Sequence, residues 1–600
     1  MTDEAVAHLT GAGEYDCLPE PLPTLRHSSA HLMAQAVTQL YPDTRLAIGP
    51  PIEDGFYYDF GRPEPFTEED VARIENRMRE LAQADYRIVR EEMSREDAVR
   101  HYEERGEPYK LEILRGLPPE VTRVSFYRQG EFVDLCRGPH VPSTGHIRAF
   151  KLLSTSGAYW RGDERRPMLQ RIYGTAWPTQ EELDQHLWRL GEARRRDHRK
   201  LGRELDLFIF QDVSPGAPFW LPKGMIVFRE LERYARELQD ARGYQEISTP
   251  ILVNKRLWEQ SGHWELYAEN MFRLEIEAQL FSLKPMNCPE STFVYRHALR
   301  SYRDLPLRFA EMGRLHRNER SGTLTGLLRV RQFTQDDAHI YCRPDQLQDE
   351  IAGVLELIRD FYGTFELVPT FKLATRPDKY LGTVEQWEQA DRALEDALKS
   401  NGLAFTLKPG DATFYGPKID IHIEDALGRD WQMATIQADL TMVPERFELE
   451  YVDSDGRAKR PIAIHRAILG SFERFIGVLT EHFAGAFPTW LAPVQARVLP
   501  VSEKHQTYAR PLFERLREAG LRAELDDRGE KLGYKIREAQ VQKIPYMRVV
   551  GERESRDGAV SVRKRSGEDL GAMPVERFLA EVTAEIRTRA VTSRIGSQRG

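Results

Sequence analysis

The spacing of apolar and polar positions changes several times within the first third of the chain. Residues 26–42, "RHSSAHLMAQAVTQLYP", repeat apolar side chains at helical spacing, whereas residues 55–60, "GFYYDF", have the aromatic content of a strand. Residues 67–83, "TEEDVARIENRMRELAQ", return to a charged helical pattern. We therefore expect an α+β domain over residues 25–177, preceded by a short extension over residues 1–24.

The middle of the chain has a different pattern. A very charged helical segment, residues 178–206, is expected to connect the first domain to the next. Over residues 207–493, runs rich in β-branched and aromatic side chains, such as "KIDIHIED" (418–425) and "WQMATIQADL" (431–440), follow one another across short turns. This favours an antiparallel sheet over a Rossmann fold, and neither a G-x-x-x-x-G-K-[ST] nor a G-x-G-x-x-G motif occurs.

The pattern changes again after "PTWLAPVQ". Residues 494–600 follow the order βαβαββα, which predicts a compact domain built on a mixed sheet. The fold class expected for the whole chain is therefore multidomain α+β.

Composition narrows the class of protein. Net charge is −9, with 85 Lys and Arg against 94 Asp and Glu, so the chain is not expected to coat nucleic acid non-specifically. No uninterrupted apolar run approaches the roughly 18 residues of a membrane-spanning helix, and the acidic start does not resemble a secretory signal. The four cysteines, Cys17, Cys136, Cys288 and Cys342, are scattered, which indicates a reducing compartment. We expect a cytoplasmic protein.

Two pairs of reactive side chains recur at one spacing in the first domain. His27 and His31 in "HSSAH" are four residues apart on an expected helix, so both rings face one side. Cys136 and His140 in "DLCRGPH" repeat that spacing. Alone, the first pair is equally well two polar helix residues, but the two pairs together indicate a site that holds and deprotonates a water molecule.

A second group of polar side chains is expected on neighbouring strands of the central block. Arg317 and Glu319 take alternate positions of a predicted strand, and Gln335, Asp337 and His339 alternate on the next. Buried charges need partners, and an arginine offers a two-pronged donor to phosphate or carboxylate. The pattern favours a binding function over a structural one.

Cys288, in "SLKPMNCPES", is by itself most simply interpreted as a buried thiol. With His339 and His465 it has the donor set of a zinc site that keeps one position open. The three are far apart in the sequence, so spacing gives this interpretation little support. Arg474 lies on the helix that is expected to follow His465.

The chain resembles the bacterial-type threonyl-tRNA synthetases, which are class II aminoacyl-tRNA synthetases, from Leu25 to about Arg587. The motifs that carry the resemblance are "RHSSAHL", "GFYYDF", "LCRGPHVP", "GAYWRGD", "LQRIYGTAW", "SGHWELY", "KPMNCP", "HRNE", "FTQDDAHIYC", "FYGPKIDI", "HRAILGSFERFIG" and "FPTWLAPVQ". The resemblance implies a class II catalytic domain between an editing domain and an anticodon-binding domain. It also implies activation of L-threonine with ATP and transfer to the 3′ end of tRNA(Thr), with hydrolysis of mischarged seryl-tRNA(Thr).

The resemblance implies roles for residues at the activation site. One Zn²⁺ per subunit is expected on Cys288, His339 and His465, and threonine contacts on Asp337, Gln335, Tyr415 and Gln437. A site that binds the threonine hydroxyl would reject valine, which lacks it. ATP, with Mg²⁺, is expected on Arg317, Glu319, Arg329, Phe333, Gln432, Thr435 and Arg474. Arg317, Lys418 and His263 are the expected catalytic residues, His263 assisting transfer to tRNA.

Serine has the same hydroxyl as threonine and is smaller, so a zinc site cannot exclude it and a second, editing site is needed. By the same resemblance, the editing residues are His27, His31, Lys110, Cys136 and His140, and they position water without a metal. Glu554 and Arg563 are the expected anticodon contacts. The motif-1 region ending at Pro250 implies a homodimer.

The sequence departs from the family at several positions. We expect the family's N-terminal ubiquitin-like domain to be missing. Ser29, Gly529, Gln332 and Met433-Ala434 replace more usual residues, Glu290-Ser291 stands where the family has Gly-His, and one extra residue lies near Met442. Several of these lie around the zinc pocket. We hypothesise a specialised copy that evades a natural inhibitor of threonyl-tRNA synthetase.

The alternative function is a non-catalytic, tRNA-binding regulatory paralogue. The presence of all the activation residues counts against it, and their completeness also excludes a stand-alone editing hydrolase.

Overall fold

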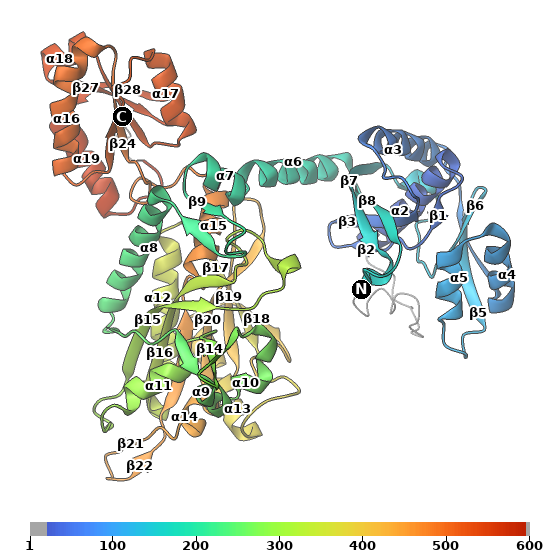
Figure 1. Ribbon diagram of the computed structural model, residues 1–600, viewed down its shortest axis with the longest axis horizontal. Helices are drawn as coiled ribbons and strands as arrows, with labels where there is room; N and C mark the ends of the chain where they lie inside the picture. The colour runs from blue at the N-terminus through green and yellow to red at the C-terminus, as the bar shows by residue number, and fades with distance from the viewer. Residues whose placement is uncertain (1–20, 594, 596–600) are drawn as a thin grey trace. The chain divides into compact units, whose positions relative to one another are not determined.

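The computed structural model describes residues 21–593 and residue 595, which belong to two compact units, residues 1–191 and residues 192–600 (Figure 1). The predicted extension over residues 1–24 lies mostly outside the described residues, and so does Cys17. Among the described helices, none combines the length and apolar character needed to cross a bilayer.

The first unit is an α+β structure, as predicted. The long helix α2 packs against a sheet with strand order β1-β3-β8-β7, in which β2 also pairs with β3, and a second sheet has the order β4-β5-β6. The helices are α2 (Pro21–Leu40), α3 (Glu68–Gln83), α4 (Arg95–Arg105) and α5 (Pro108–Arg115). The strands are β1 (Arg45–Leu46), β2 (Pro51–Ile52), β3 (Gly55–Gly61), β4 (Ile88–Ser94), β5 (Arg123–Gln129), β6 (Phe132–Leu135), β7 (Ala149–Tyr159) and β8 (Met168–Trp177).

The apolar spacing of α2 is what fixes the first unit's core. Leu32, Met33, Ala36 and Val37 are fully buried in the cluster that α2 shares with α3 and the sheet. Because residues three and four apart share a helix face, the same turns that bury these side chains also set the direction of His27 and His31.

The charged connector is two helices, α6 (Gln180–Arg196) and α7 (His198–Glu204). Asp197 separates them: its side chain accepts a hydrogen bond from the backbone N–H of Arg199 at 2.8 Å and caps α7. An N-cap residue has non-helical backbone angles, so the continuous helix expected here is interrupted.

The second unit contains an eight-stranded sheet with the order β11-β15-β16-β23-β20-β19-β17-β18. Its central pairs are antiparallel, as predicted, and only the β11–β15 and β17–β18 pairs are parallel. The helices of this region are α8 (Pro222–Asp240), α9 (Lys255–Ser261), α10 (His263–Leu266), α11 (Cys288–Arg296), α12 (Leu347–Gly363), α13 (Val384–Ser400), α14 (Met442–Arg446) and α15 (Phe472–His482). The strands are β9 (Phe208–Phe210), β10 (Pro218–Trp220), β11 (Gln245–Glu246), β12 (Leu252–Asn254), β13 (Arg273–Ile276), β14 (Gln279–Leu283), β15 (Leu307–His316), β16 (Gln332–Cys342), β17 (Pro369–Ala374), β18 (Phe405–Lys408), β19 (Lys418–Glu424), β20 (Asp430–Asp439), β21 (Tyr451–Val452), β22 (Ala458–Lys459) and β23 (Ile462–Ala467).

Alternation along β16 separates the core of this sheet from its polar face. Ala338, Ile340 and Cys342 are buried in the large apolar cluster that includes α12, α13 and α15. Asp337 and His339, between them, project to the opposite face, because successive strand residues point to opposite sides. The helical layer therefore covers one face, and polar side chains gather on the other.

The C-terminal part has the predicted βαβαββα order, with one extra short helix before β27. Its sheet order is β25-β24-β26-β27-β28, parallel among the first three strands and antiparallel among the last three. The elements are β24 (Ala496–Pro500), α16 (Gln506–Glu518), β25 (Ala523–Leu525), α17 (Leu532–Val541), β26 (Tyr546–Val550), α18 (Glu552–Asp557), β27 (Ala559–Lys564), β28 (Asp569–Pro574) and α19 (Val575–Arg587).

Candidate active sites

Cys288, His339 and His465 form one cluster, although they are far apart in the sequence. Cys288 is the first residue of α11, and His339 and His465 are directly paired across β16 and β23. The two imidazole rings are 4.9 Å apart in an edge-to-face arrangement. One donor atom from each of the three side chains lies within 4.8 Å of the others, and all three residues are buried.

The electrostatics of this cluster suit a divalent cation. Burial, with the charges of His465 and Arg466, lowers the pKa of His339 well below its ordinary value, so the imidazole is neutral and has a lone pair to offer. Burial and the carboxylates of Asp337, Glu290 and Asp439 raise the pKa of the Cys288 thiol. A cation would relieve this crowding of negative groups around the sulfur.

Asp439, which sequence reasoning missed, holds His465. Its Oδ2 lies 3.0 Å from Nε2 of His465, while its two oxygens accept backbone N–H groups of Thr441, Met442 and Val443 at 2.7–3.0 Å. A carboxylate behind a histidine fixes the orientation of the ring. The sequence contains one usable signal, an acidic residue at the end of a predicted strand.

Residues expected to contact threonine surround this cluster. Asn287 Nδ2 donates to Asp337 at 3.0 Å, the Tyr415 ring is 5.5 Å from the His465 ring, and the Tyr415 hydroxyl donates to Gln437. Gln335 is half-buried on the same face of β16 as Asp337. The structure thus brings the four predicted threonine contacts to one side of the sheet.

The predicted ATP residues form a cluster of guanidinium groups. Burial, and then the positive charges of Arg317 and Arg329, lower the pKa of Arg474. Glu319 is ion-paired with Arg329 at 2.9 Å, and the Arg317 guanidinium lies 5.0 Å from the centre of the Phe333 ring. Three cations around one carboxylate leave a net positive site that fits a polyphosphate.

The strand predicted to carry Arg317 and Glu319 ends too early for them. β15 stops at His316, so the two residues lie just beyond it, and the expectation that they alternate on a strand is wrong. The Arg317 backbone N–H still donates to Arg331 O at 2.8 Å, in the register of the β15–β16 pair. The chain turns just beyond, because the Arg331 N–H donates to Gly216 O at 2.6 Å and the Glu319 N–H donates to Arg317 O at 2.8 Å. Their side chains nevertheless lie with Arg329 and Arg474.

The other residues expected at the activation site have distinct surroundings. Gln432 is exposed on β20, where its backbone oxygen accepts from Arg474 at 3.3 Å, and Thr435 is half-buried. Lys418 is ion-paired with Asp420 at 2.7 Å. His263 is fully buried, and burial followed by the charges of His465 and Arg446 lowers its pKa to about 3. Its Nε2 has no hydrogen-bond partner among the described residues.

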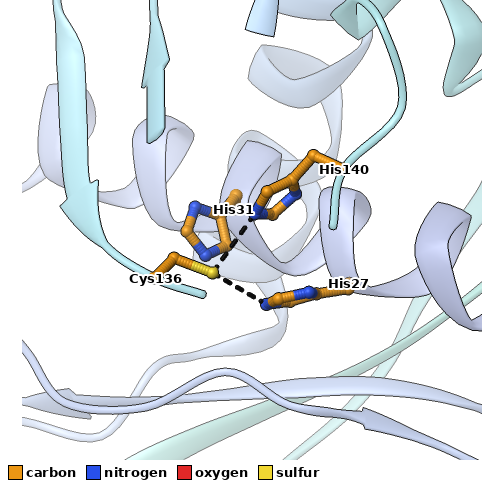
Figure 2. A group of neighbouring side chains, drawn as sticks. All are labelled: His27, His31, Cys136 and His140. Carbon is orange, nitrogen blue, oxygen red and sulfur yellow. Dashed lines mark hydrogen bonds between the residues drawn. The ribbon is translucent and has the colours of Figure 1, made fainter. Parts of the chain in front are cut away.

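A second cluster lies in the first unit, where the two predicted pairs meet (Figure 2). Cys136 Sγ is 3.2 Å from His27 Nε2 and 3.3 Å from His140 Nε2, and the His31 ring is 4.4 Å from the His140 ring. Burial, with the charges of neighbouring residues, lowers the pKa of His31 and His140 well below the ordinary value. The imidazoles are therefore neutral and can accept a proton from water.

Lys110 lines the same cavity. It is ion-paired with Asp134 at 2.6 Å, and Tyr58 donates to the same carboxylate at 2.7 Å. The cavity has a volume of about 70 Å³ and is lined in part by His27, His31, Tyr58, Lys110 and Cys136. Sequence reasoning missed Asp134, although it precedes "LC" in a strand.

The two expected anticodon residues lie on adjacent elements of the C-terminal part. Glu554, on α18, accepts the backbone N–H of Gly551 at 2.9 Å, and Arg563, on β27, is ion-paired with Asp569 at 2.7 Å. Both are half-buried. Gly529 is exposed between β25 and α17.

Glu290 and Ser291 occupy the wall behind Cys288. Ser291 Oγ is 2.6 Å from the Tyr341 hydroxyl, but neither carboxylate oxygen of Glu290 has a partner among the described residues. Burial raises the pKa of Glu290 to about 8. A buried polar group without a partner is costly, so stability does not explain its presence.

Comparison with protein families matches three parts of the chain. Residues 272–483 match the tRNA synthetase class II core domain (G, H, P, S and T), and residues 495–585 match the anticodon binding domain. Residues 124–173 match the threonyl and alanyl tRNA synthetase second additional domain.

Two curated relatives are the threonine–tRNA ligases of Caldanaerobacter subterraneus and Carboxydothermus hydrogenoformans. They are 55% and 54% identical, each over 94% of this chain and over 87% and 89% of the relative. Among solved structures, the RNA binding domain of threonyl-tRNA synthetase from Cryptosporidium parvum matches with a TM-score of 0.63 and 42% identity, over 66% of this chain and 100% of the other. A putative threonyl-tRNA synthetase from Aeropyrum pernix matches with a TM-score of 0.59 and 29% identity, over 66% and 97%.

Proposed function

Since this chain belongs to the threonyl-tRNA synthetases, a class II family of aminoacyl-tRNA ligases, we propose that its two clusters of side chains divide the work between synthesis and proofreading. The protein is a threonine–tRNA ligase with a class II catalytic core, an anticodon-binding domain and an editing-type domain. It joins L-threonine to tRNA(Thr) at the expense of ATP.

The arginine cluster carries the assignment of the ATP site. Arg317, Arg329 and Arg474 concentrate positive charge beside the sheet face that presents Asp337 and His339, so the phosphates and the amino acid are held next to each other. Arg317 would neutralise the α-phosphate as the threonine carboxylate attacks it and pyrophosphate leaves, and Mg²⁺ bound with ATP would share the charge. We propose that Lys418 and Thr435 border this site and that Glu319 and Phe333 contact the adenine end of ATP.

Cys288, His339 and His465 are the residues that would hold zinc. The donor set of one thiolate and two neutral imidazoles fits a four-coordinate zinc ion with one position open to substrate. Zinc bound there would supply a Lewis-acidic position for the amino and hydroxyl groups of threonine. Asp337, Gln335, Tyr415 and Gln437 would orient the substrate around it.

His263 is proposed to assist transfer to the tRNA ribose. Its buried, neutral imidazole has one nitrogen, Nδ1, 2.7 Å from Ser261 Oγ. The unpartnered Nε2 is the atom that would exchange a proton with the attacking hydroxyl.

The first-unit cluster is proposed to hydrolyse seryl-tRNA(Thr). His27, His31, Cys136 and His140 surround a small cavity in which a neutral imidazole would deprotonate water, and Lys110 is held at its edge by Asp134. By the family pattern, no metal is required.

Replacing the buried histidine tests this editing role. His31→Ala is expected to slow deacylation of seryl-tRNA(Thr) about 100-fold, the lower end of what a general base contributes, while leaving threonine-dependent pyrophosphate exchange unchanged. Deacylation is followed with radiolabelled seryl-tRNA. His146→Ala, at an exposed histidine of the same unit, is the control. If His31→Ala deacylated seryl-tRNA(Thr) at the wild-type rate, His31 would not be part of the editing site.

The remaining assignments concern partners and location. We propose that Glu554 and Arg563 contact the anticodon, that the protein is a homodimer through the region ending at Pro250, and that it acts in the cytoplasm. The clustering of site residues on separate units supports binding of one tRNA at several places.

The altered pocket wall supports a further proposal, that the protein is an inhibitor-resistant copy. Glu290 and Ser291 change the surroundings of Cys288, while the proposed metal ligands and arginines are all present. Exchanging the pair for the family's Gly-His, as Glu290→Gly with Ser291→His, is expected to lower the inhibition constant of pocket-directed inhibitors about tenfold. Inhibition of threonine-dependent exchange measures it, with an ordinary family member alongside. Equal sensitivity of all three enzymes would remove the proposal.

Charging of tRNA tests the function as a whole. Purified protein with ATP, Mg²⁺, threonine and a tRNA(Thr) transcript is expected to form threonyl-tRNA, measured as acid-precipitable radiolabelled threonine. The non-catalytic regulatory paralogue would bind the transcript without charging it.

A further inference from the structure

His198, the first residue of α7, is the centre of a buried hydrogen-bond network that the proposed chemistry does not use. Its Nδ1 is 2.6 Å from Glu481 Oε1, and its backbone N–H donates to the same oxygen at 3.1 Å. Its Nε2 accepts the backbone N–H of Leu327 at 2.9 Å. Both His198 and Leu327 are buried.

Leu327 belongs to the returning limb of the loop between β15 and β16, residues 326–331, which we call the loop limb. Arg329 of the loop limb pairs with Glu319, and Arg331 O accepts the backbone N–H of Arg317 at 2.8 Å. The position of the loop limb therefore sets the position of the proposed ATP residues.

Helix α15 holds the loop limb at two successive residues. Arg474, near the start of α15, donates to Leu328 O at 3.1 Å, while Glu481, near its end, holds His198 against Leu327. Gly477 lies between them, and a Cβ there would come within 3.2 Å of both Leu327 and Leu328. The helix, α7 and the loop limb are thus in close contact, with little room for adjustment.

The donors around His198 fix its tautomer. A backbone N–H can only donate, so Nε2 must present a lone pair to Leu327, and the ring proton is on Nδ1 facing Glu481. Burial alone would raise the pKa of Glu481, but hydrogen bonds from His198 and the charge of Arg429 hold it below its ordinary value, so the carboxylate is available to accept. Arg429 itself donates to Glu481 at 2.6 Å and also pairs with Asp425.

We propose that His198 is a positioning residue for ATP: it joins α7 to the loop limb and so keeps Arg317, Glu319 and Arg329 in position relative to Arg474. The inference rests on the proposed ATP site. Through His198, α7, which directly follows α6, contacts the loop that carries the proposed ATP residues.

Two replacements separate the two bonds that His198 makes. Asn places its amide N–H near the position of Nδ1, so His198→Asn keeps the donor to Glu481 and loses the acceptor for Leu327. Gln places its oxygen near the position of Nε2, so His198→Gln keeps the acceptor for Leu327 and loses the donor. A residue with only a structural role would respond to both changes alike.

The measurement is ATP–pyrophosphate exchange with the full chain, with KM determined separately for ATP and for threonine. His198→Asn is expected to raise the KM for ATP about tenfold, as a buried N–H loses its acceptor, with the KM for threonine unchanged. His198→Gln is expected to stay within about threefold of wild type for both substrates. Unchanged ATP kinetics in His198→Asn, or an equal rise for both substrates in both variants, would overturn the inference.

Gly326→Ala tests the same contact while leaving His198 intact, which covers the case in which a His198 variant does not fold. A Cβ at residue 326 would fall 2.1 Å from His198 Nε2, and the backbone there has a positive φ of 49°, so the loop limb must move away. We expect the same selective rise in the KM for ATP, and wild-type kinetics would contradict it. Absence of exchange in the wild-type enzyme would instead refute the proposed function.

Discussion

Cys288→Ala is expected to lose stoichiometric zinc and to reduce threonine-dependent pyrophosphate exchange at least about 100-fold. Removing one of three protein ligands leaves two histidines, whereas zinc sites of this type use three and an open position. The lost metal position is the one proposed to recognise the threonine hydroxyl. Residual exchange should therefore discriminate poorly between threonine and valine.

Metal analysis and exchange kinetics on the same preparations check this result. Cys342→Ala is the matched control, because Cys342 is a buried cysteine on β16, the strand of His339, and faces the helical layer instead. It should keep zinc and activity. Full zinc content in Cys288→Ala would show that another set of residues holds the metal.

Arg317→Ala is expected to lower kcat/KM for ATP in the exchange reaction by about 10²- to 10³-fold. Electrostatic stabilisation of a charged transition state by one preorganised donor is of this size. The side chain is half-buried, next to Phe333 and near Arg474, so its charge is incompletely screened by water.

The control for this prediction is Arg314→Ala, because Arg314 is an exposed arginine on β15, three residues earlier. It should leave the kinetics unchanged. If Arg317→Ala bound ATP and turned over like the wild type, the arginine cluster would not be the phosphate site.

Much of the architecture was predictable from local patterns. The apolar spacing of α2 and the alternation along β16 both reflect burial of one face, and that preference survives in the folded protein. The four-residue spacing of His27 and His31 correctly indicated a shared helix face, and Cys136 and His140 join them. The antiparallel sheet followed from strands joined by short turns.

The features that the sequence did not predict depend on interactions between residues distant in the chain. β15 ends at His316 because the backbone N–H of Arg331 donates to Gly216 O instead of to Arg317 on the paired strand. The connector breaks at Asp197 because the Asp197 side chain caps the next helix. The partners Asp439 and Asp134 are single acidic residues whose roles appear only when strands are adjacent. The clustering of Cys288 with His339 and His465 could not be predicted from spacing, and only the resemblance to a family indicated it.

The most direct test of the central claim is ATP–pyrophosphate exchange with threonine, serine and valine, using the purified enzyme with zinc and Mg²⁺. We expect robust exchange with threonine, measurable exchange with serine because it keeps the hydroxyl, and exchange with valine lower by about 10⁴-fold or more. Absence of exchange with threonine would contradict the assignment of the activation site. Efficient exchange with valine would contradict recognition of the hydroxyl at Cys288, His339 and His465.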